Sequence, residues 1–306
     1  MQASSKAVKS PPNVSSSVGK LRKNNWFDYL NLTVMLLFSI AILYPFYNSI
    51  LVSFTPESVY IKTPFMFLPK ALTLDSYYIV FQSKVIFTGF GVTTLITVVG
   101  VAYNMLLTVL MAYCFNREFP GKKVILYLIL FTMFFSGGLI PYYLLVKDLH
   151  LMNSIFSMIL PTGVSITYMT VMRQYFAALP EELQESARLD GASEFVILFL
   201  IILPLALPIV VTFALYYGIE RWNEWWNGML FIKDAFKQPL QLVLRGIIQS
   251  ATSEAMSSNL QEAGIVPFSD GVKMASVVVT MTPIMCVYPF LQKYFVQGLA
   301  IGAVKG

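Results

Sequence analysis

Six long apolar runs constrain the fold of this chain more than any other feature. They cover residues 29–54, 87–115, 124–146, 154–175, 195–218 and 274–295. Each is near or above the ~20 residues that a helix needs to cross the hydrocarbon core of a bilayer. Hydrophobic residues make up 57% of the 306 residues and charged residues 12%, which is more apolar surface than a soluble domain can bury. The sequence therefore predicts an all-α membrane protein with six transmembrane helices.

The charges between these runs predict the orientation of the chain. Residues 1–25 are rich in Ser, Lys and Pro and are expected to be a disordered basic tail. A tail that binds nucleic acid or lipid is one alternative, but a cytoplasmic anchor that follows the positive-inside bias is simpler, so we expect no nucleic acid partner. Arg117, Lys122 and Lys123 mark a second cytoplasmic loop, and Lys147 is the only Lys or Arg of the short third loop, which is predicted outside. The transmembrane domain, residues 26–295, then leaves a cytoplasmic C-terminal tail, residues 296–306.

Several kinds of chemistry have no residues to support them. The interiors of the six runs contain no charged residue or His, which weighs against a proton-coupled carrier, although a sodium site built from backbone carbonyls would leave no such trace. The chain has no G-x-x-x-x-G-K-[ST] motif, so ATP must be bound by another chain. The lone His150 predicts no metal site, and Cys114 and Cys286 are expected to be inert buried thiols. We expect no catalytic residue and no cofactor in this chain.

One long polar segment, residues 177–195, interrupts the apolar pattern and predicts a short helix that ends in a sharp turn. Pro180 suits the first helical position, and Glu181 and Glu182 fall in the first turn, where the helix dipole favours negative charge. Gly191 supplies a left-handed turn, and Ser193 can cap the helix that follows.

The apolar side chains of this segment allow two interpretations. Leu183 and Ala187 lie four residues apart and form a small apolar stripe. The segment is either an ordinary amphipathic helix between two spans or a docking helix that a partner grips by this stripe, with acidic side chains around the contact.

A longer pattern in the same segment resembles the E-A-A signature of ABC-importer permeases. Glu185-Ser186-Ala187, then Gly191, then Ile201 and Leu203-Pro204 match its spacing, and Ser186 replaces the second Ala, small for small. In that family this loop is a coupling helix that sits in a cleft of the cytoplasmic ATP-hydrolysing subunit. The resemblance implies that the residues that couple to the ATPase are Glu181, Glu182, Leu183, Glu185, Ser186, Ala187, Arg188, Asp190 and Gly191.

Two prolines follow this coupling loop directly. Pro204 and Pro208 each remove a backbone donor and tend to kink the helix that contains them. They either reflect the packing irregularity common in membrane helices or pass a movement at Glu185 into the fifth span as a tilt.

The long segment predicted outside the membrane, residues 219–273, begins with three of the four tryptophans. Tryptophan near a span end usually anchors the interface, but flat aromatic rings with Asn and acidic groups also suit carbohydrate. Trp222 and Trp225 would share a face if this region were helical. The candidate substrate path contains Tyr216, Tyr217, Trp222, Asn223, Trp225, Trp226 and Asn227. Residues 251–270 are expected to form a loop that meets an external partner.

The C-terminus and further segments extend the resemblance. Gly298, Gly302, Lys305 and Gly306 resemble the ending of maltose-type carbohydrate-importer permeases, which implies that Gly302, Lys305 and Gly306 reach the ATPase dimer. Segments that resemble the branch importing complex oligosaccharides, including alginate, are Tyr44-Pro45, residues 131–141, Trp222-Asn223 and residues 239–242.

This resemblance implies a type I ABC importer permease architecture and a non-catalytic subunit that translocates an oligo- or polysaccharide. The implied partners are a second permease, two ATP-binding cassette subunits that hold ATP and Mg, and an extracytoplasmic sugar-binding protein. The implied location is the bacterial cell membrane, with both termini cytoplasmic. The alternative is a secondary active transporter of a small solute, which would need no ATPase and would show matched broken helices in internal repeats. A membrane enzyme would cluster its catalytic groups, and none cluster here.

Overall fold

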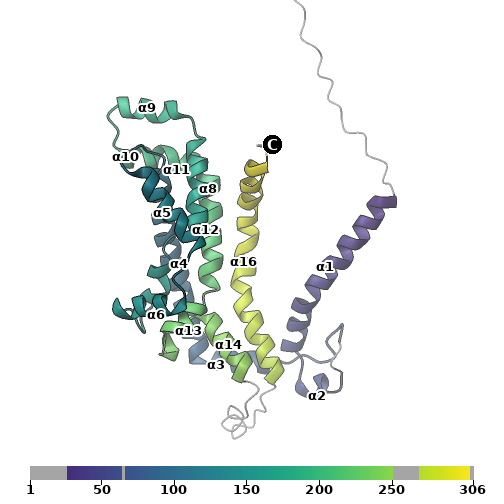
Figure 1. The fold of residues 1–306 in the computed structure, drawn as a ribbon. Helices are drawn as coiled ribbons and strands as arrows, with labels where there is room; N and C mark the ends of the chain where they lie inside the picture. Colours follow the sequence, from purple (N-terminus) through teal and green to yellow (C-terminus); the bar gives the residue numbers. More distant parts are fainter. Residues whose placement is uncertain (1–25, 64–65, 251–268, 304–306) are drawn as a thin grey trace, which may run out of the picture. The chain divides into compact units, whose positions relative to one another are not determined.

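The structure is a computed structural model that describes residues 26–63, 66–250 and 269–303 (Figure 1). Helices and loops, without a β-strand, make up these described ranges, as the sequence predicts. The elements are α1 Trp26–Ser53, α2 Glu57–Tyr60, α3 Asp75–Gln82, α4 Lys84–Cys114, α5 Lys122–Phe134, α6 Leu139–Asp148, α7 Phe156–Ile159, η1 Leu160–Thr162, α8 Ile166–Ala177, α9 Glu181–Leu189, α10 Glu194–Val196, η2 Ile197–Ile202, α11 Leu203–Leu205, α12 Leu207–Trp222, α13 Trp226–Phe231, η3 Ala235–Lys237, α14 Leu240–Ser250 and α16 Ser269–Ala303.

The chain divides into two compact units, residues 1–47 and residues 48–306. The first unit holds most of helix α1, which covers the predicted first span. The buried residues of α1 are Leu51, Val52 and Ser53 at its C-terminal end, and the rest of the helix is apolar and largely exposed. An apolar helix with so little burial in its own chain is suited to contact with lipid or with another membrane helix.

Helix α4 is the central element of the second unit. It covers the predicted second span, and α8, α12 and α14 all pack against it. Helix α16 contains the predicted sixth span and continues to Ala303, so residues 296–303 of the predicted C-terminal tail extend this helix. By length and composition α1 and α4 can each cross a membrane alone, and two bent helix pairs raise the number of candidate spans among the described residues to four.

Three predicted spans are not single straight helices. The third is α5 followed by α6, and the two helices meet at an angle of 117°. The break lies at residues 135–138, where Gly138 has a φ of +88° that other residues adopt only at a cost. The fourth is divided between α7, η1 and α8, because Pro161 and Gly163 interrupt the helix there.

The fifth predicted span is also bent. The helical stretch Glu194–Leu205 and helix α12 meet at 87°. The break lies at Ala206, between Pro204 and Pro208, and the stretch before it contains the π-helical turns of η2. Two prolines four residues apart remove two backbone donors within one turn, which explains a sharp bend at this position.

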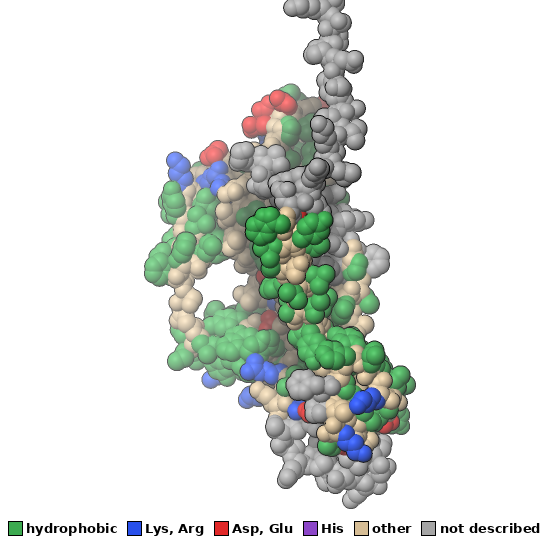
Figure 2. Space-filling view, turned by 90° about the vertical axis from the view of Figure 1, so that its right-hand side faces the viewer, with side chains coloured by type: hydrophobic (Ala, Val, Ile, Leu, Met, Phe, Trp, Pro, Cys, Tyr) green, Lys and Arg blue, Asp and Glu red, His purple; other side chains and the backbone are tan. Residues whose placement is uncertain are grey.

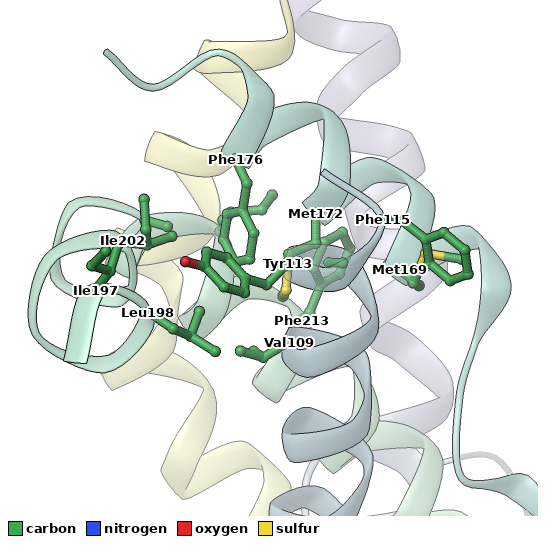
Figure 3. Close-up of a cluster of buried hydrophobic side chains, with 13 residues drawn as sticks. Val109, Tyr113, Phe115, Met169, Met172, Phe176, Ile197, Leu198, Ile202 and Phe213 are labelled. Atoms are coloured by element: carbon green, nitrogen blue, oxygen red, sulfur yellow. The ribbon is translucent and has the colours of Figure 1, made fainter. Parts of the chain in front are cut away.

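The largest hydrophobic core lies where this bend meets α4 and α8 (Figure 3). Tyr113 from α4, Met172 and Phe176 from α8, and Ile197 and Ile202 from η2 are buried in it. Figure 3 shows the Tyr113 ring inside this cluster, with its hydroxyl directed toward the Ile197–Ile202 segment. The core therefore joins the segment that follows α9 to the central helix.

Candidate coupling and translocation sites

Helix α9 lies at one end of the bundle, near α10 and α11, and α13 and α14 lie toward the other end (Figure 1). Glu181 and Glu182 occupy its first turn, as predicted. Pro180, however, is the N-cap residue with φ −57° and ψ 123° and not the first helical residue. Its extended ψ turns the chain out of α8 before the helix begins, which explains the one-residue difference.

Backbone hydrogen bonds fix the end of α9. The Ala192 N–H donates to the Ala187 carbonyl (2.9 Å), and the Gly191 N–H donates to the Arg188 carbonyl (3.0 Å). These two bonds form a Schellman motif, which needs a left-handed residue, and Gly191 has a φ of +82°. The Ser193 side chain then accepts a hydrogen bond from the Val196 N–H at the start of α10. The predicted glycine stop and serine cap are both present.

The exposed face of α9 differs from the predicted apolar stripe. Leu183 is 46% exposed, but Ala187 packs against the large hydrophobic core. The exposed apolar residue that joins Leu183 is instead Leu189, which is 89% exposed, and Ser186 lies on the same outer face. Ala187 of the predicted Leu183–Ala187 stripe is therefore partly used to pack α9 onto its own chain, and the docking of a partner on this helix stays a prediction.

Acidic side chains accompany this face. Glu181, Glu182, Glu185 and Asp190 are all exposed, and Figure 2 shows acidic side chains gathered at the end of the molecule at which α9 lies. The exposed surface of α9 therefore consists of Leu183, Leu189 and Ser186, surrounded by carboxylate side chains.

A charged network ties α9 to the central helix through Glu194. The Arg188 Nε donates to Glu194 Oε1 (3.0 Å), and Arg117 Nη2 lies 3.1 Å from Glu194 Oε2. The Tyr113 hydroxyl donates to the same carboxylate and accepts from Arg117. One glutamate thus connects the last turn of α9 with the C-terminal end of α4. We name the network of Tyr113, Arg117, Arg188 and Glu194 the Glu194 network.

The electrostatics of this network favour the charged carboxylate. The hydrogen bond from Tyr113, together with those from Arg188 and the charge of Arg117, lowers the pKa of Glu194 below that of an ordinary glutamate. The hydrogen bond to Glu194 raises the pKa of Arg188. The ion pairs of the Glu194 network are therefore fully charged at neutral pH. Because its members are partly exposed, solvent reaches the network.

A second charged centre lies within the bundle and was not expected. Arg221, near the end of α12, is only 4% exposed. Its Nε and Nη2 donate to Asn104 Oδ1 (3.1 and 2.8 Å), and its remaining bonds go to the carbonyls of Met158 (2.5 Å), Ile159 (3.4 Å) and Thr162 (2.8 Å). The guanidinium therefore satisfies backbone carbonyls released where the fourth span is broken. We name Arg221, Asn104 and these carbonyls the Arg221 centre.

The position of this centre corrects one prediction. Residues 219–222 belong to helix α12, so they do not begin the loop that was predicted to start at residue 219. Asn104 lies within about two turns of the midpoint of α4, so Arg221 and its neighbour Glu220 lie beside the middle part of that helix. The fifth apolar run, as delimited in the sequence, ends before these charges, and carbonyls and an amide replace water around Arg221 and make its burial possible.

Two of the predicted substrate-path residues are buried structural contacts. The Tyr217 hydroxyl hydrogen-bonds Thr108 Oγ1 (2.8 Å) and accepts from the Ser165 N–H (2.9 Å). Asn227 accepts from the Tyr142 hydroxyl (2.9 Å) and donates its backbone and side-chain N–H groups to the Glu224 carboxylate. Both side chains are occupied by the protein, so neither is exposed to a substrate in this conformation.

The tryptophans do not form one platform. Helix α12 ends at Trp222, so Trp222 and Trp225 do not share a helical face. Trp222 packs edge-on against Phe90 and lines an apolar cavity of about 410 Å³ between α4, α12 and α16. Trp225 lies under the guanidinium of Arg245 at 4.2 Å. Tyr216 is partly buried, whereas Asn223 and Trp226 are exposed. A place for these three residues in the substrate path therefore stays a prediction.

Other predicted residues lie elsewhere. Gly302 is within α16, whereas Lys305, Gly306, the tail of residues 1–25 and residues 251–268 of the loop predicted to meet an external partner lie outside the described residues. Cys114 and Cys286 are exposed in this chain and not buried as predicted, because both lie on outward faces of apolar helices, where apolarity of the run does not report burial.

Sequence reasoning missed Tyr113, Arg117, Glu194, Asn104 and Arg221. A charged residue directly after the Ser193 cap was a usable signal for Glu194. No local pattern pairs Arg221 with Asn104, which is 117 residues away.

The comparisons with known proteins agree on one family. Residues 104–301 match the family model described as "Binding-protein-dependent transport system inner membrane component". The permease protein YtcP of a polygalacturonan/rhamnogalacturonan transport system from Bacillus subtilis (strain 168) is 36% identical over 93% of this chain and 100% of its own length. Protein LplC from the same organism is 39% identical over 92% of this chain and 95% of its own.

A solved structure shares both fold and sequence. It is a chain of a bacterial ABC transporter involved in the import of the acidic polysaccharide alginate, with a TM-score of 0.83 and 29% identity over 88% of this chain and 96% of that one. The matched family region contains α9, the Glu194 network and the Arg221 centre. By family match, by full-length relatives and by fold, this chain belongs to the inner membrane components of binding-protein-dependent transport systems, the permease subunits of ABC importers.

Proposed function

We propose that this chain is the non-catalytic permease subunit of an ATP-driven importer that translocates an oligo- or polysaccharide across a bacterial cell membrane. Its partners would be a second permease, two ATP-binding cassette subunits that bind ATP and Mg, and an extracytoplasmic sugar-binding protein. The observation that carries the proposal is α9, a short helix with an exposed outer face and a rigid glycine stop at one end of the bundle. The transport function in the name of the relative YtcP and the alginate import named for the solved structure support the substrate class.

The contacts suggest how movement of an ATPase would enter the bundle. A subunit that holds the Leu183 and Leu189 face would carry α9 with it. Because Ala187 packs on the core and Arg188 binds Glu194, a displacement of α9 would be passed to η2 and to the end of α4. The bend at Ala206 would then convert this displacement into a tilt of α12, and the spans would change between inward-facing and outward-facing states.

Recovery of the assembly is the first experiment. The chain is purified in mild detergent from its native host, and the co-purified subunits and their ATPase activity are measured with a panel of saccharides and the binding protein. We expect a second permease, an ATPase dimer and stimulation by one saccharide class. Recovery of the chain alone, active in transport without an ATPase, would instead support a secondary transporter.

A matched glycine pair tests the role of α9. Gly191 and Gly121 both have left-handed φ values, +82° and +81°, with no heavy atom within 4 Å of an added Cβ, apart from their own chain neighbours. Changing either to Val imposes backbone strain of about 1–3 kcal/mol. We expect Gly191→Val to abolish saccharide-stimulated ATPase activity while the complex still inserts, and Gly121→Val, which lies before α5, to retain stimulation. Equal loss in both variants would assign the effect to strain alone.

A further inference from the structure

A partly exposed acidic and aromatic surface lies on α8 and α12 beside the Arg221 centre. The Tyr168 hydroxyl donates to Glu220 Oε1 (2.6 Å). The Tyr168 ring stacks on Phe213 at 4.9 Å between ring centroids and lies 5.7 Å from the ring of Tyr216. Glu220 follows Tyr216 by one helical turn, so both residues lie on one side of α12.

The position of this surface disfavours lipid as its neighbour. Glu220 is exposed in this chain and directly precedes Arg221, which contacts Asn104 near the middle of α4. A carboxylate at that depth is costly against hydrocarbon and is found where a protein faces water, a substrate or another protein. The apolar cavity lined by Trp222 lies on another side of α12, since its lining residues Val211, Leu215 and Gly218 fall on a face well away from Tyr216 and Glu220.

The residue types fit a carbohydrate better than a hydrophobic partner helix. Sugar rings present weakly apolar C–H faces that stack on aromatic side chains, and their hydroxyls donate to carboxylates. A carboxylate accepts several hydrogen bonds, so the single bond from Tyr168 leaves acceptor capacity on Glu220. Tyr168 also holds the carboxylate in place, which lowers the entropy lost on binding.

We propose that Glu220, Tyr168 and Tyr216 form a saccharide-contact surface in the translocation path, in which Tyr216 stacks on a sugar ring and Glu220 accepts its hydroxyls. This inference rests on the proposed function. It moves the substrate contacts away from the tryptophans and onto the α8–α12 side of the bundle.

The first test asks whether water reaches this surface and does not depend on the saccharide. Glu220→Cys and Leu106→Cys are made in a chain that carries Cys114→Ser and Cys286→Ser, within the complete importer in liposomes. Leu106 is exposed and lies two residues from Asn104, so it reports the same depth on a different face. We expect a sulphonated methanethiosulfonate reagent to label the Glu220→Cys variant in at least one nucleotide state and to leave the Leu106→Cys variant unlabelled. Absence of Glu220→Cys labelling in every state, as expected if the second permease covers the surface, would overturn the proposal.

The second test measures the saccharide dependence of ATPase activity. The probes are oligomers of galacturonate and of alginate, and arabino-oligosaccharides, each with the binding protein. For the probe that stimulates the wild type, we expect Glu220→Gln and Tyr216→Ala to raise the half-saturating concentration of loaded binding protein, or to lower maximal stimulation, by about tenfold. Glu220→Gln keeps the size and shape of the side chain, so its thermal stability should stay close to that of the wild type. Tyr127→Ala, at an exposed position on α5, is the matched control.

The outcomes separate the two levels of the proposal. A wild-type importer that no saccharide stimulates would contradict the proposed function. A stimulated wild type whose Glu220→Gln and Tyr216→Ala variants behave like Tyr127→Ala would contradict the saccharide-contact surface alone. Tyr168→Phe, which removes only the hydroxyl that positions Glu220, should give a smaller rise of about two- to fivefold.

Discussion

The Arg221 centre and the Glu194 network stabilise charged side chains in this bundle in opposite ways. Arg221 is almost fully buried, and its hydrogen bonds go to an amide oxygen and backbone carbonyls, with no acidic residue among them. Glu194 is half exposed and is held by two arginines and a tyrosine hydroxyl. The first arrangement fixes one geometry, since Asn104 Oδ1 and the carbonyls of Met158 and Ile159 would lose buried hydrogen bonds if Arg221 moved, whereas the Thr162 carbonyl would keep its bond from Asn104 Nδ2.

The second arrangement can rearrange at low cost. Water and ions reach the Glu194 network, so its members can be solvated when they separate, and exposed ion pairs are individually weak. The difference suggests a division of roles, in which the Arg221 centre keeps the broken fourth span rigid and the Glu194 network transmits movement. Variants of the two centres test this division of roles, and the one with the largest expected effect comes first.

Loss of the Arg221 guanidinium should destabilise the chain most. Arg221→Met keeps much of the side-chain volume but removes all five donated hydrogen bonds. Each buried acceptor left without a donor costs about 1–3 kcal/mol, so we expect a clear fall in the thermal unfolding midpoint and in yield. Arg245→Met removes the same charge from an exposed position over Trp225 and should cost about 0.5–1 kcal/mol. Equal midpoints for the two variants would show that the Arg221 centre is not a rigid anchor.

Adding a side-chain atom next to Arg221 should lower the stability of the chain by a smaller amount. A Cβ on Gly100 would lie 3.0 Å from the Cδ and Nε atoms of Arg221, whereas a Cβ on Gly91 of the same helix would meet no heavy atom beyond its chain neighbours within 4 Å. Gly100→Ala must therefore displace the guanidinium and should cost about 1–3 kcal/mol.

Gly91→Ala provides the control on the same helix. It should stabilise α4 by up to about 1 kcal/mol through helix propensity, so the two thermal shifts should have opposite signs. Shifts of the same sign would indicate that the guanidinium moves without cost.

These two centres also show what sequence patterns can and cannot predict. The apolar runs predicted α1, α4 and α16, because a long hydrophobic helix is specified by its own residues. The Gly191 turn was predictable for the same reason, since a left-handed residue and a nearby cap are local features. Pro204 and Pro208 indicated a kink in the fifth span, but the apolar pattern does not show the breaks in the third and fourth spans, because hydropathy does not distinguish a straight helix from a broken one.

The Arg221 centre lay beyond any local pattern. Asn104 is an ordinary polar residue in an apolar run, and its role depends on a partner far along the chain. The same limit explains why Tyr217 and Asn227 were placed in the substrate path: their side chains are suited to sugar hydroxyls, but here they bond to Thr108 and Tyr142.

Neutralising Glu194 should change coupling more than stability. Glu194→Gln keeps an acceptor for Tyr113 but removes the ion pairs with Arg117 and Arg188, and exposed pairs contribute about 0–1 kcal/mol. We expect saccharide-stimulated ATPase activity to fall several-fold, while basal ATPase activity and the unfolding midpoint stay near wild type. Glu118→Gln removes an exposed pair with Lys122 outside the network and should leave stimulation unchanged. If both variants keep full stimulation, the network does not transmit movement.

The smallest effect should be a dependence on acid pH. The network lowers the pKa of Glu194, so the folded chain releases this proton more readily than the unfolded chain does. The stabilisation is therefore complete above the ordinary glutamate pKa of about 4.3 and is lost as the pH falls through the lowered folded value. We expect the difference in unfolding midpoint between wild type and Glu194→Gln to stay constant from about pH 8 to pH 5 and to shrink below pH 4.3. A difference that grows on acidification would mean that the neutral carboxyl is the better partner, and the network would then have to be described as a hydrogen-bonded contact and not as a charged one. Arg221 offers the contrast, because its carbonyl acceptors have no proton to gain in this range and the Arg221→Met difference should not vary with pH.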